Sequence, residues 1–296
     1  MAGHGNAKRL LPKVIQMLDQ AKLDYELVET KQRGHGIVLA KDAALAGIPI
    51  VVAAGGDGTA NEVLNGLLQA RQIQPSTTLL GLIGLGRGND YSGSLGIPAD
   101  LPQQIQILSN AKHKSVDVGR VTGGLVPDGR YFCNCVGVGF DTVVTIQAAK
   151  LPRWGGFLSF LAAVIKTVFL YSKGPLIHIT YDGQNLSQRC LLVSVMNGRR
   201  LGGSFWMAPE AQFDDGFFDL CIAREVSQLR IFGLIPHFIK GDQATQPEIT
   251  TGKLTRISMT TDEGALPAQT DGEIISYDGK SITVELFPRY IDVICP

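Results

Sequence analysis

Apolar positions in the first hundred residues alternate between a helical and a strand periodicity. One face of the first helix carries Val14, Ile15 and Leu18, with Pro12 near its start. The pattern predicts helices over residues 12–23, 36–46 and from Thr59 onward, and strands over residues 25–30, 48–54 and 79–85. The strands at 48–54 and 79–85 are almost continuously apolar, as is typical of parallel strands covered on both faces. This alternation predicts an open parallel α/β domain.

The pattern changes after about Lys114. Short β-rich segments separated by Gly, Pro, Asp or Asn follow one another, at residues 131–138, 176–181, 191–196, 217–222, 256–260 and 281–286. Only two further helices are predicted, over residues 156–171 and 229–240. We therefore expect an α/β domain over residues 1–114 and a mostly antiparallel β-sandwich domain over residues 115–296. The last segment of the chain could pack back on the first domain.

Composition narrows the class of protein. The chain has 296 residues, of which 45% are hydrophobic and 18% charged, which fits a folded globular protein with two domains. Lys and Arg together number 27, as do Asp and Glu, so no net charge favours nucleic acid as a partner. The five cysteines form no C-x-x-C pair, and we interpret them as reduced, mostly buried thiols of a cytoplasmic protein.

The longest apolar run is short for a membrane span. It extends over residues 155–171, is interrupted by Lys166, and the N-terminus lacks a secretion signal, so we predict no transmembrane segment. A helix that is apolar around most of its circumference is usually part of a core. Alternatively, this run could line an acyl pocket or touch a bilayer, with nearby Lys150, Arg153 and Lys166 meeting lipid headgroups.

A glycine-rich loop follows the strand at 48–54. Its sequence is Gly55-Gly56-Asp57-Gly58-Thr59, and Thr59 with Glu62 has the spacing of a capping box that starts the next helix. Glycines let backbone N–H groups approach phosphate oxygens, and a helix N-terminus favours anions. A carboxylate beside phosphates, as at Asp57, requires a metal ion to offset the repulsion. The alternative is an ordinary β–α turn; nothing in the sequence demands Asp57 for packing.

A second glycine cluster follows the strand at 79–85. It runs from Gly84 to Tyr91 and includes Arg87, which could pair with phosphate oxygens or remain solvated. Ligands of open α/β sheets lie beyond the carboxyl ends of the strands. Both glycine loops and Thr30, at the end of the strand at 25–30, belong to that edge.

These motifs resemble those of the diacylglycerol kinase catalytic family, which includes bacterial lipid kinases and sphingosine kinases. Gly55–Thr59, together with Asn61 and Glu62, resembles the nucleotide signature of that family, and Gly84–Asp90 resembles its second loop. The resemblance covers nearly the whole chain and continues through Asn134, Gly137-Val138-Gly139-Phe140-Asp141, Asn197-Gly198, Gly202-Gly203, Ala208-Pro209, Asp214-Asp215-Gly216 and Asp271-Gly272-Glu273.

The resemblance implies a lipid kinase that transfers the γ-phosphoryl group of ATP to a lipid hydroxyl in an interdomain cleft, with Mg²⁺. ATP contacts would fall on Thr30, Gly55, Gly56, Asp57, Gly58, Thr59, Asn61, Glu62 and Arg87. The metal would be held by the Asp215 carboxylate and by the backbone carbonyls of Gln212 and Phe217. Glu273 would accept the proton, and Asp57 would be the second catalytic residue. The family further implies a protein peripheral to the membrane, in which a homodimer is possible.

Two departures from the family are visible. Members usually open with a strand ending in Asn-Pro-x-Ser/Ala-Gly, whereas this sequence begins inside that motif at Met1-Ala2-Gly3. A first strand and its ATP-contacting Asn-Pro are therefore expected to be missing, through a start assigned too late or through weakened nucleotide binding. Arg87 stands where many members carry threonine.

Three alternatives remain open from the sequence. An NAD-kinase-like enzyme shares the Gly-Gly-Asp-Gly-Thr loop, and a catalytically impaired lipid-binding relative would keep the fold without transfer. The Asp214-Asp215-Gly216 and Asp271-Gly272 motifs could also be plain turns, because Asp-Gly favours hairpins.

Overall fold

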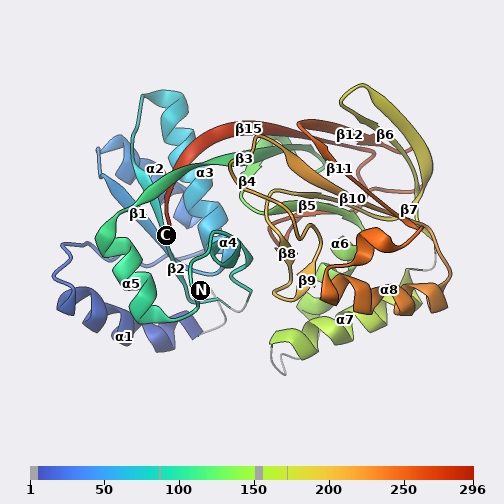
Figure 1. Cartoon of the computed structure of the whole chain (residues 1–296). Coiled ribbons are helices and arrows are strands. Elements are labelled where there is room, and N and C mark those ends of the chain that lie inside the picture. Colours follow the sequence, from blue (N-terminus) through green and yellow to red (C-terminus); the bar gives the residue numbers. More distant parts are fainter. Residues whose placement is uncertain (1–5, 87, 151–155, 172) are drawn as a thin grey trace. The chain divides into compact units, whose positions relative to one another are not determined.

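The computed structural model describes residues 6–86, 88–150, 156–171 and 173–296, and the chain divides into two units (Figure 1). Unit 1 comprises Met1–Val116 and Arg289–Pro296, and unit 2 comprises Asp117–Pro288. Unit 1 contains parallel strands with helices, and unit 2 is an antiparallel β-sandwich with helices. The fold class predicted from the sequence is confirmed.

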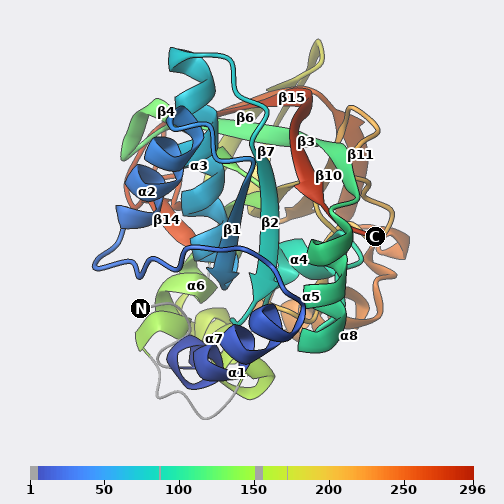
Figure 2. The ribbon, with the colours of Figure 1, turned by 90° about the vertical axis from the view of Figure 1, so that its left-hand side faces the viewer.

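The elements of unit 1 follow the α/β order. They are α1 (Asn6–Gln20), α2 (His35–Leu45), β1 (Ile50–Gly55), α3 (Asp57–Ile73), β2 (Leu79–Gly84), α4 (Asp90–Ser94) and α5 (Leu101–Asn110). Strands β1 and β2 are parallel and paired from Ile50 with Leu79 to Gly55 with Gly84, and they lie side by side in Figure 2. Val293, near the C-terminus, pairs in parallel with Leu80 of β2.

Helix α3 packs one face into the core of unit 1. The four apolar residues predicted for this face are all buried, Val63, Leu64, Leu67 and Leu68. On the α2 side, a Cβ atom on Gly66 would lie 2.4 Å from the carbonyl oxygen of Ile37. The two helices therefore approach at backbone distance, which fixes the middle of α3 against the first turn of α2.

The segment predicted as a strand at residues 25–30 is irregular, so this prediction is wrong. Tyr25, Leu27 and Val28 are 37%, 44% and 52% exposed. A strand needs a neighbour for its backbone hydrogen bonds, and β1 pairs with β2 on one side only, as the edge strand of the described sheet. The β-favouring side chains alone do not make the segment a strand.

The helices of unit 1 also differ from the prediction in two respects. Helix α1 begins at Asn6, so that Pro12 lies inside it and not near its start. The short α4 and the longer α5 were not predicted, although Asp100 caps α5 by accepting a hydrogen bond from the Gln103 N–H, with a proline in the first turn.

Unit 2 is built mainly from strands, with three helices among the residues that the structure describes. Its elements are β3 (His113–Gly123, which begins in unit 1), β4 (Val126–Phe132), β5 (Cys135–Gly139), α6 (Phe140–Lys150), α7 (Gly156–Leu170), β6 (Leu176–Tyr181), β7 (Gln184–Met196), β8 (Arg200–Leu201), β9 (Phe205–Trp206), β10 (Phe218–Arg224), α8 (Gln228–Lys240), the 3₁₀ turn η2 (Gln243–Thr245), β11 (Ile249–Leu254), β12 (Arg256–Thr260), β13 (Ala268–Thr270), β14 (Glu273–Ser276) and β15 (Ser281–Ile294, which ends in unit 1).

The long strand β7 connects the two parts of the sandwich. Its first half pairs with β6, from Tyr181 opposite Gln184 to Leu176 opposite Arg189. Its second half lies between β5 and β10. Apolar side chains of these strands form one core between the sheets, in which the Phe132 and Phe218 rings stack with centroids 5.5 Å apart.

A second core of unit 2 lies between β5, β7 and β10 and the helices α6, α7 and α8, which gather on one side of these strands in Figure 1. Helix α7 buries Val164 and Val168 there but exposes Ile165, Phe169 and Leu170. Helix α7 is therefore core on one face only. None of the helices in the described part of the chain combines the length and apolar character that a membrane span requires.

Two predictions for unit 2 need correction. The strand expected over residues 131–138 is broken at Cys133-Asn134 into β4 and β5, and α6 was missed. Gly139 has a positive φ of 97°, which ends β5 and lets α6 start at Phe140. All five cysteines are buried and carry free thiols, as predicted.

Candidate functional site

The two glycine loops of unit 1 meet at the carboxyl ends of β1 and β2. The Leu85 N–H donates to the Gly55 carbonyl oxygen at 2.8 Å. A Cβ atom on Gly86 would lie only 2.6 Å from Gly56 Cα, and one on Gly55 would lie 2.3 Å from Thr59 Oγ1. Only glycine permits this backbone-to-backbone contact, and the result is a surface of peptide groups at the start of α3.

Asp57 joins these two loops. Its Oδ1 accepts a hydrogen bond from the Tyr91 N–H at 3.0 Å. Burial raises the pKa of the Asp57 carboxyl, while the backbone N–H groups of Tyr91, Asp90 and Asn89 act in the opposite direction. The side chain therefore has a structural partner 34 residues away, which corrects the expectation that its packing role is small.

The capping box predicted from Thr59 and Glu62 is not formed. Helix α3 begins at Asp57 with Gly56 as its N-cap. The two oxygens of Glu62 accept hydrogen bonds from the N–H groups of Gly34 at 2.8 Å and Gly36 at 2.9 Å. Glu62 therefore holds the start of α2 against α3. The Thr59–Glu62 spacing does not reveal this contact, because its partners lie 26 and 28 residues away.

The remaining residues predicted to contact ATP lie in different surroundings. Asn61 is fully buried, and its side-chain and backbone oxygens both accept from the Asn65 amide. Gly58 lies in the first turn of α3, and Thr30 is half-buried at the end of the irregular segment before α2. Arg87 lies outside the described residues.

In unit 2, Glu273 follows a two-residue hairpin turn between β13 and β14. Both turn residues have positive φ, 47° at Asp271 and 82° at Gly272, as in a type I′ turn, so the turn predicted from Asp-Gly is confirmed. The buried Asp271 carboxylate accepts three backbone hydrogen bonds at 2.8–2.9 Å, from Cys133, Asn134 and Cys135. It fixes the turn, and with it the half-buried Glu273, to the break between β4 and β5.

The loop predicted to hold a metal precedes β10. Asp215 Oδ1 accepts from the Phe217 N–H, and its Oδ2 forms an ion pair with Lys253. Gln212 is exposed, and Phe217 is 43% exposed. Within the described ranges, no three His, Cys, Asp or Glu side chains form a group able to hold a metal ion.

A second carboxylate near this loop was not singled out from the sequence. Asp219, on β10, is half-buried, and its Oδ2 is buried without a hydrogen-bond partner among the described atoms. Burial raises the pKa of Asp219 to about 6; Lys253 acts to lower it, and the negative charges of Asp215 and Glu210 raise it further. Asp219 therefore has charges of both signs near it, Lys253 as well as Asp215 and Glu210.

The predicted metal loop and the Glu273 turn are connected through buried polar groups. The Asp117 carboxylate accepts from the Gly216 N–H at 2.8 Å. The Asn197 amide donates to the carbonyl oxygens of Asp117 and Cys133 at 2.9 and 2.8 Å. Cys133 in turn donates its N–H to Asp271. Asn197 belongs to a motif noted in the sequence, whereas nothing there indicated Asp117.

Glycine loops that meet where two parallel strands end and a helix begins are typical of phosphate-binding α/β proteins, and unit 2 adds a carboxylate-bearing turn. The class is that of a nucleotide-dependent phosphotransferase.

Comparison with known proteins gives the family. The profile of the diacylglycerol kinase catalytic domain matches residues 1–121, and that of the YegS C-terminal NAD kinase beta sandwich-like domain matches residues 134–295. A diacylglycerol kinase of Bacillus subtilis (strain 168) is 30% identical over 98% of this chain and 91% of its own length. A Chromohalobacter salexigens protein named "Probable lipid kinase YegS-like" is 34% identical over 68% of this chain and 62% of its own length.

Among solved structures, a putative diacylglycerol kinase from Bacillus anthracis str. Sterne superposes with a TM-score of 0.79 at 26% identity, covering 100% of this chain and 94% of that one. The chain belongs to the diacylglycerol kinase family. It is an ATP-dependent lipid kinase with an alcohol group as acceptor.

Proposed function

We propose that unit 1 binds ATP at the two glycine loops and that unit 2 binds a diacylglycerol-like lipid and carries the proton acceptor. The observation that carries this proposal is the contact between Gly56 and Gly86 at the start of α3. Backbone N–H groups and the helix N-terminus provide a positive potential there without a net positive charge on the protein. Asp57 would keep the two loops in register.

Glu273 is proposed to accept the proton of the lipid hydroxyl. As the hydroxyl oxygen attacks the γ-phosphorus, the new O–P bond forms, the bond to the β-phosphate oxygen breaks and ADP leaves. The hydroxyl proton passes to the carboxylate. Phosphoryl transfer depends mainly on positioning and on charge stabilisation. The contribution of Asp271 would be to hold the turn that bears Glu273.

Mg²⁺ is proposed to bind at the loop before β10. Carboxylate and carbonyl oxygens, such as those of Asp215, Gln212 and Phe217, are the ligands that this ion prefers. The partnerless Asp219 oxygen and the raised pKa of that carboxyl are compatible with a nearby cation. When bound, Mg²⁺ would offset phosphate charge; Lys253 would have to release Asp215 for that carboxylate to coordinate it.

The test is transfer of label from [γ-³²P]ATP to diacylglycerol, monoacylglycerol, sphingosine or ceramide in mixed micelles, with and without Mg²⁺. We expect transfer to a lipid, and a fall of about 10²–10⁴-fold in kcat for Glu273→Gln with unchanged ATP affinity. The exposed Asp278, a few residues along the chain, provides a matched control as Asp278→Asn. NAD as acceptor and a no-lipid ATP hydrolysis assay complete the panel.

Each outcome separates the candidates. Transfer to NAD but to no lipid would favour an NAD-kinase-like enzyme. Lipid binding without transfer would identify a catalytically impaired relative. Full turnover of the Glu273→Gln variant would reject Glu273 as the base, and loss of its ATP affinity would reassign the residue to nucleotide or metal binding.

A further inference from the structure

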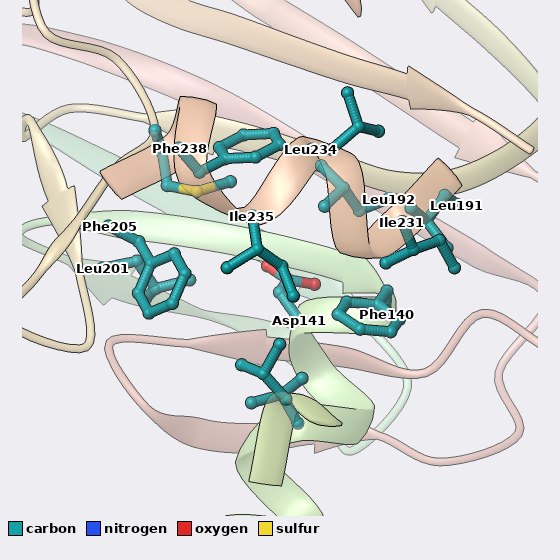
Figure 3. Close-up of a pocket in the computed structure, with 13 residues that line it drawn as sticks. Phe140, Asp141, Leu191, Leu192, Leu201, Phe205, Ile231, Leu234, Ile235 and Phe238 are labelled. Atoms are coloured by element: carbon teal, nitrogen blue, oxygen red, sulfur yellow. The ribbon is translucent and has the colours of Figure 1, made fainter. Parts of the chain in front are cut away.

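The short hairpin of β8 and β9 has two different faces. Leu201 and Phe205, which are opposite each other in its register, line an apolar cavity of unit 2 (Figure 3). Because side chains alternate along a strand, Arg200 and Trp206, the other pair in register, belong to the opposite face. Both are half-buried. The hairpin is therefore anchored in the core by one face and presents a cation and an aromatic ring on the other.

The cation and the ring contact each other. The Arg200 guanidinium lies over the ring of Trp206, with its Cζ atom 3.8 Å from the ring centroid. At this distance the positive charge is attracted by the face of the ring. The ring is held by the end of α8, since a Cβ atom on Gly241 would lie 3.2 Å from Trp206 Cβ. The guanidinium is therefore held in place by packing against an aromatic ring.

Arg200 has no anionic partner in the part of the chain that the structure describes. Its guanidinium makes neither a hydrogen bond nor an ion pair with the described residues. Three other arginines of unit 2 each pair with a glutamate, namely Arg189, Arg230 and Arg256. A guanidinium stays charged in proteins, and its N–H groups form a planar fork. Arg200 therefore offers a fixed positive charge whose donors are available to a ligand.

Two hydrogen bonds connect this arginine with the turn that carries Glu273. The side-chain amide of Asn134 donates to the Arg200 carbonyl oxygen at 2.9 Å. The N–H of the same asparagine donates to the Asp271 carboxylate at 2.9 Å. Asn134 and Asp271 are both buried. The hairpin that bears the free cation is thereby tied to the turn that bears the proposed base, within unit 2 alone.

Phosphoryl transfer changes the charge of the acceptor. A neutral hydroxyl becomes a phosphate monoester, which carries a charge of about −1.5 to −2 at pH 7. The fork of a guanidinium matches phosphate oxygens in a bidentate geometry. We propose that Arg200, held over Trp206, binds the phosphate monoester of the phosphorylated lipid, so that the enzyme binds the head of its product more tightly than the neutral head of the acceptor. This inference rests on the proposed lipid-kinase function.

The test measures binding in the absence of transfer. A monoacylglycerol phosphate and the neutral monoacylglycerol, both in mixed micelles, inorganic phosphate and ATP are each titrated calorimetrically into the full chain. With Trp154→Phe, Trp206 becomes the single tryptophan, and its fluorescence reports binding beside it. We expect Arg200→Gln to bind the monoacylglycerol phosphate about 10–100-fold more weakly. Binding of the neutral lipid and of ATP should not change.

Three further variants separate geometry from charge. Arg200→Lys keeps the charge without the planar fork and should bind the lipid phosphate with intermediate affinity. Trp206→Leu removes the ring beneath the guanidinium and should weaken binding about two- to fivefold. Lys240→Gln is the matched control, because it removes an exposed positive charge next to Gly241, beside the same tryptophan. The control should bind the lipid phosphate as the wild type does.

The outcomes distinguish this proposal from the kinase function itself. Wild-type affinity of Arg200→Gln for the monoacylglycerol phosphate overturns the site and leaves lipid phosphorylation untouched. An equal loss of affinity for ATP, an equal affinity for inorganic phosphate, or an equal loss in Lys240→Gln also overturns it, because the cation would then serve the nucleotide or any anion. Arg200-dependent binding of the lipid phosphate by a protein that transfers no phosphoryl group would support the site and reject the kinase function.

Discussion

Replacement of Asp271 by asparagine is the most direct test of how unit 2 holds its candidate base. Oδ1 of Asp271 accepts from the Asn134 and Cys135 N–H groups, and Oδ2 accepts from the Cys133 N–H. Asparagine tolerates the left-handed backbone conformation of this position, so the substitution isolates the side-chain chemistry. Its amide oxygen can keep two of the three bonds, but its NH₂ group then faces the Cys133 N–H.

The expected loss follows from that unpaired donor. A buried N–H left without an acceptor costs about 1–3 kcal/mol. For a domain of roughly 150–250 residues, such as unit 2, each kcal/mol shifts the melting temperature by about 2–4 °C, so a fall of about 2–12 °C is expected. Because the turn is loosened, kcat should fall as well, with KM for ATP unchanged.

Tryptophan fluorescence can follow the unfolding, because both tryptophans, Trp154 and Trp206, belong to unit 2 by sequence. Asp278→Asn makes the same chemical change at an exposed side chain and should melt as wild type does. If Asp271→Asn and Asp278→Asn melt at the same temperature, the three hydrogen bonds do not support the turn and the reasoning is wrong.

Three other substitutions test separate parts of the molecule. Gly86→Ala forces a Cβ atom to within 2.6 Å of Gly56 Cα. The affinity for ATP, measured by titration, should therefore fall, and the free energy of unfolding of unit 1 should decrease by about 1–3 kcal/mol. Gly93→Ala places its Cβ atom with no heavy atom of the described residues within 4 Å, so the ATP affinity and the stability should stay unchanged. Asp57→Ala should weaken ATP binding and also lower thermal stability by about 1 kcal/mol, because it removes the oxygen that accepts the Tyr91 N–H; unchanged stability would show that the bond to the second loop is dispensable. Burial raises the pKa of Asp141 from 3.8 to about 6. Between these two values the folded state retains a proton that the unfolded chain loses. The free energy of unfolding of the wild type should therefore fall by up to ~3 kcal/mol as the pH rises from about 4 to about 6. Urea unfolding of Asp141→Asn should lack this pH dependence, and the same slope in both proteins would reject the assignment.

Local patterns in the sequence predicted the elements that carry strong periodicity. Strands β6 and β12 have the predicted bounds, and β1, β2 and α3 follow the predicted order. The failures have identifiable causes. Helix α6 was hidden because Thr142, Val143, Val144 and Thr145 are β-branched and favour a strand locally. The segment at residues 25–30 has the composition of a strand, but it does not form one because it pairs with no neighbouring strand.

The candidate site was less predictable, because its hydrogen bonds join distant parts of the chain. Asp57 and Tyr91 are 34 residues apart, and Asp271 and Cys133 are 138 residues apart. Glycine loops and an Asp-Gly turn identified where chemistry is expected. The spacing of Thr59 and Glu62 predicted a capping box within α3, whereas the Glu62 carboxylate binds backbone N–H groups at the start of α2.

The buried polar groups of unit 2 explain why the proposed metal loop and the proposed base can act together. Each such group destabilises the fold unless it is hydrogen-bonded. The NH₂ group of Asn197 is satisfied, whereas its Oδ1 is buried without a partner among the described atoms. Asn197 donates to the carbonyl oxygens of both Asp117 and Cys133, and these two residues lead to Gly216 on one side and Asp271 on the other. The loop and the turn are thereby fixed relative to each other within unit 2 alone. Charge stabilisation by preorganised groups requires such fixed positions, because groups that must reorient during the reaction lose much of their effect.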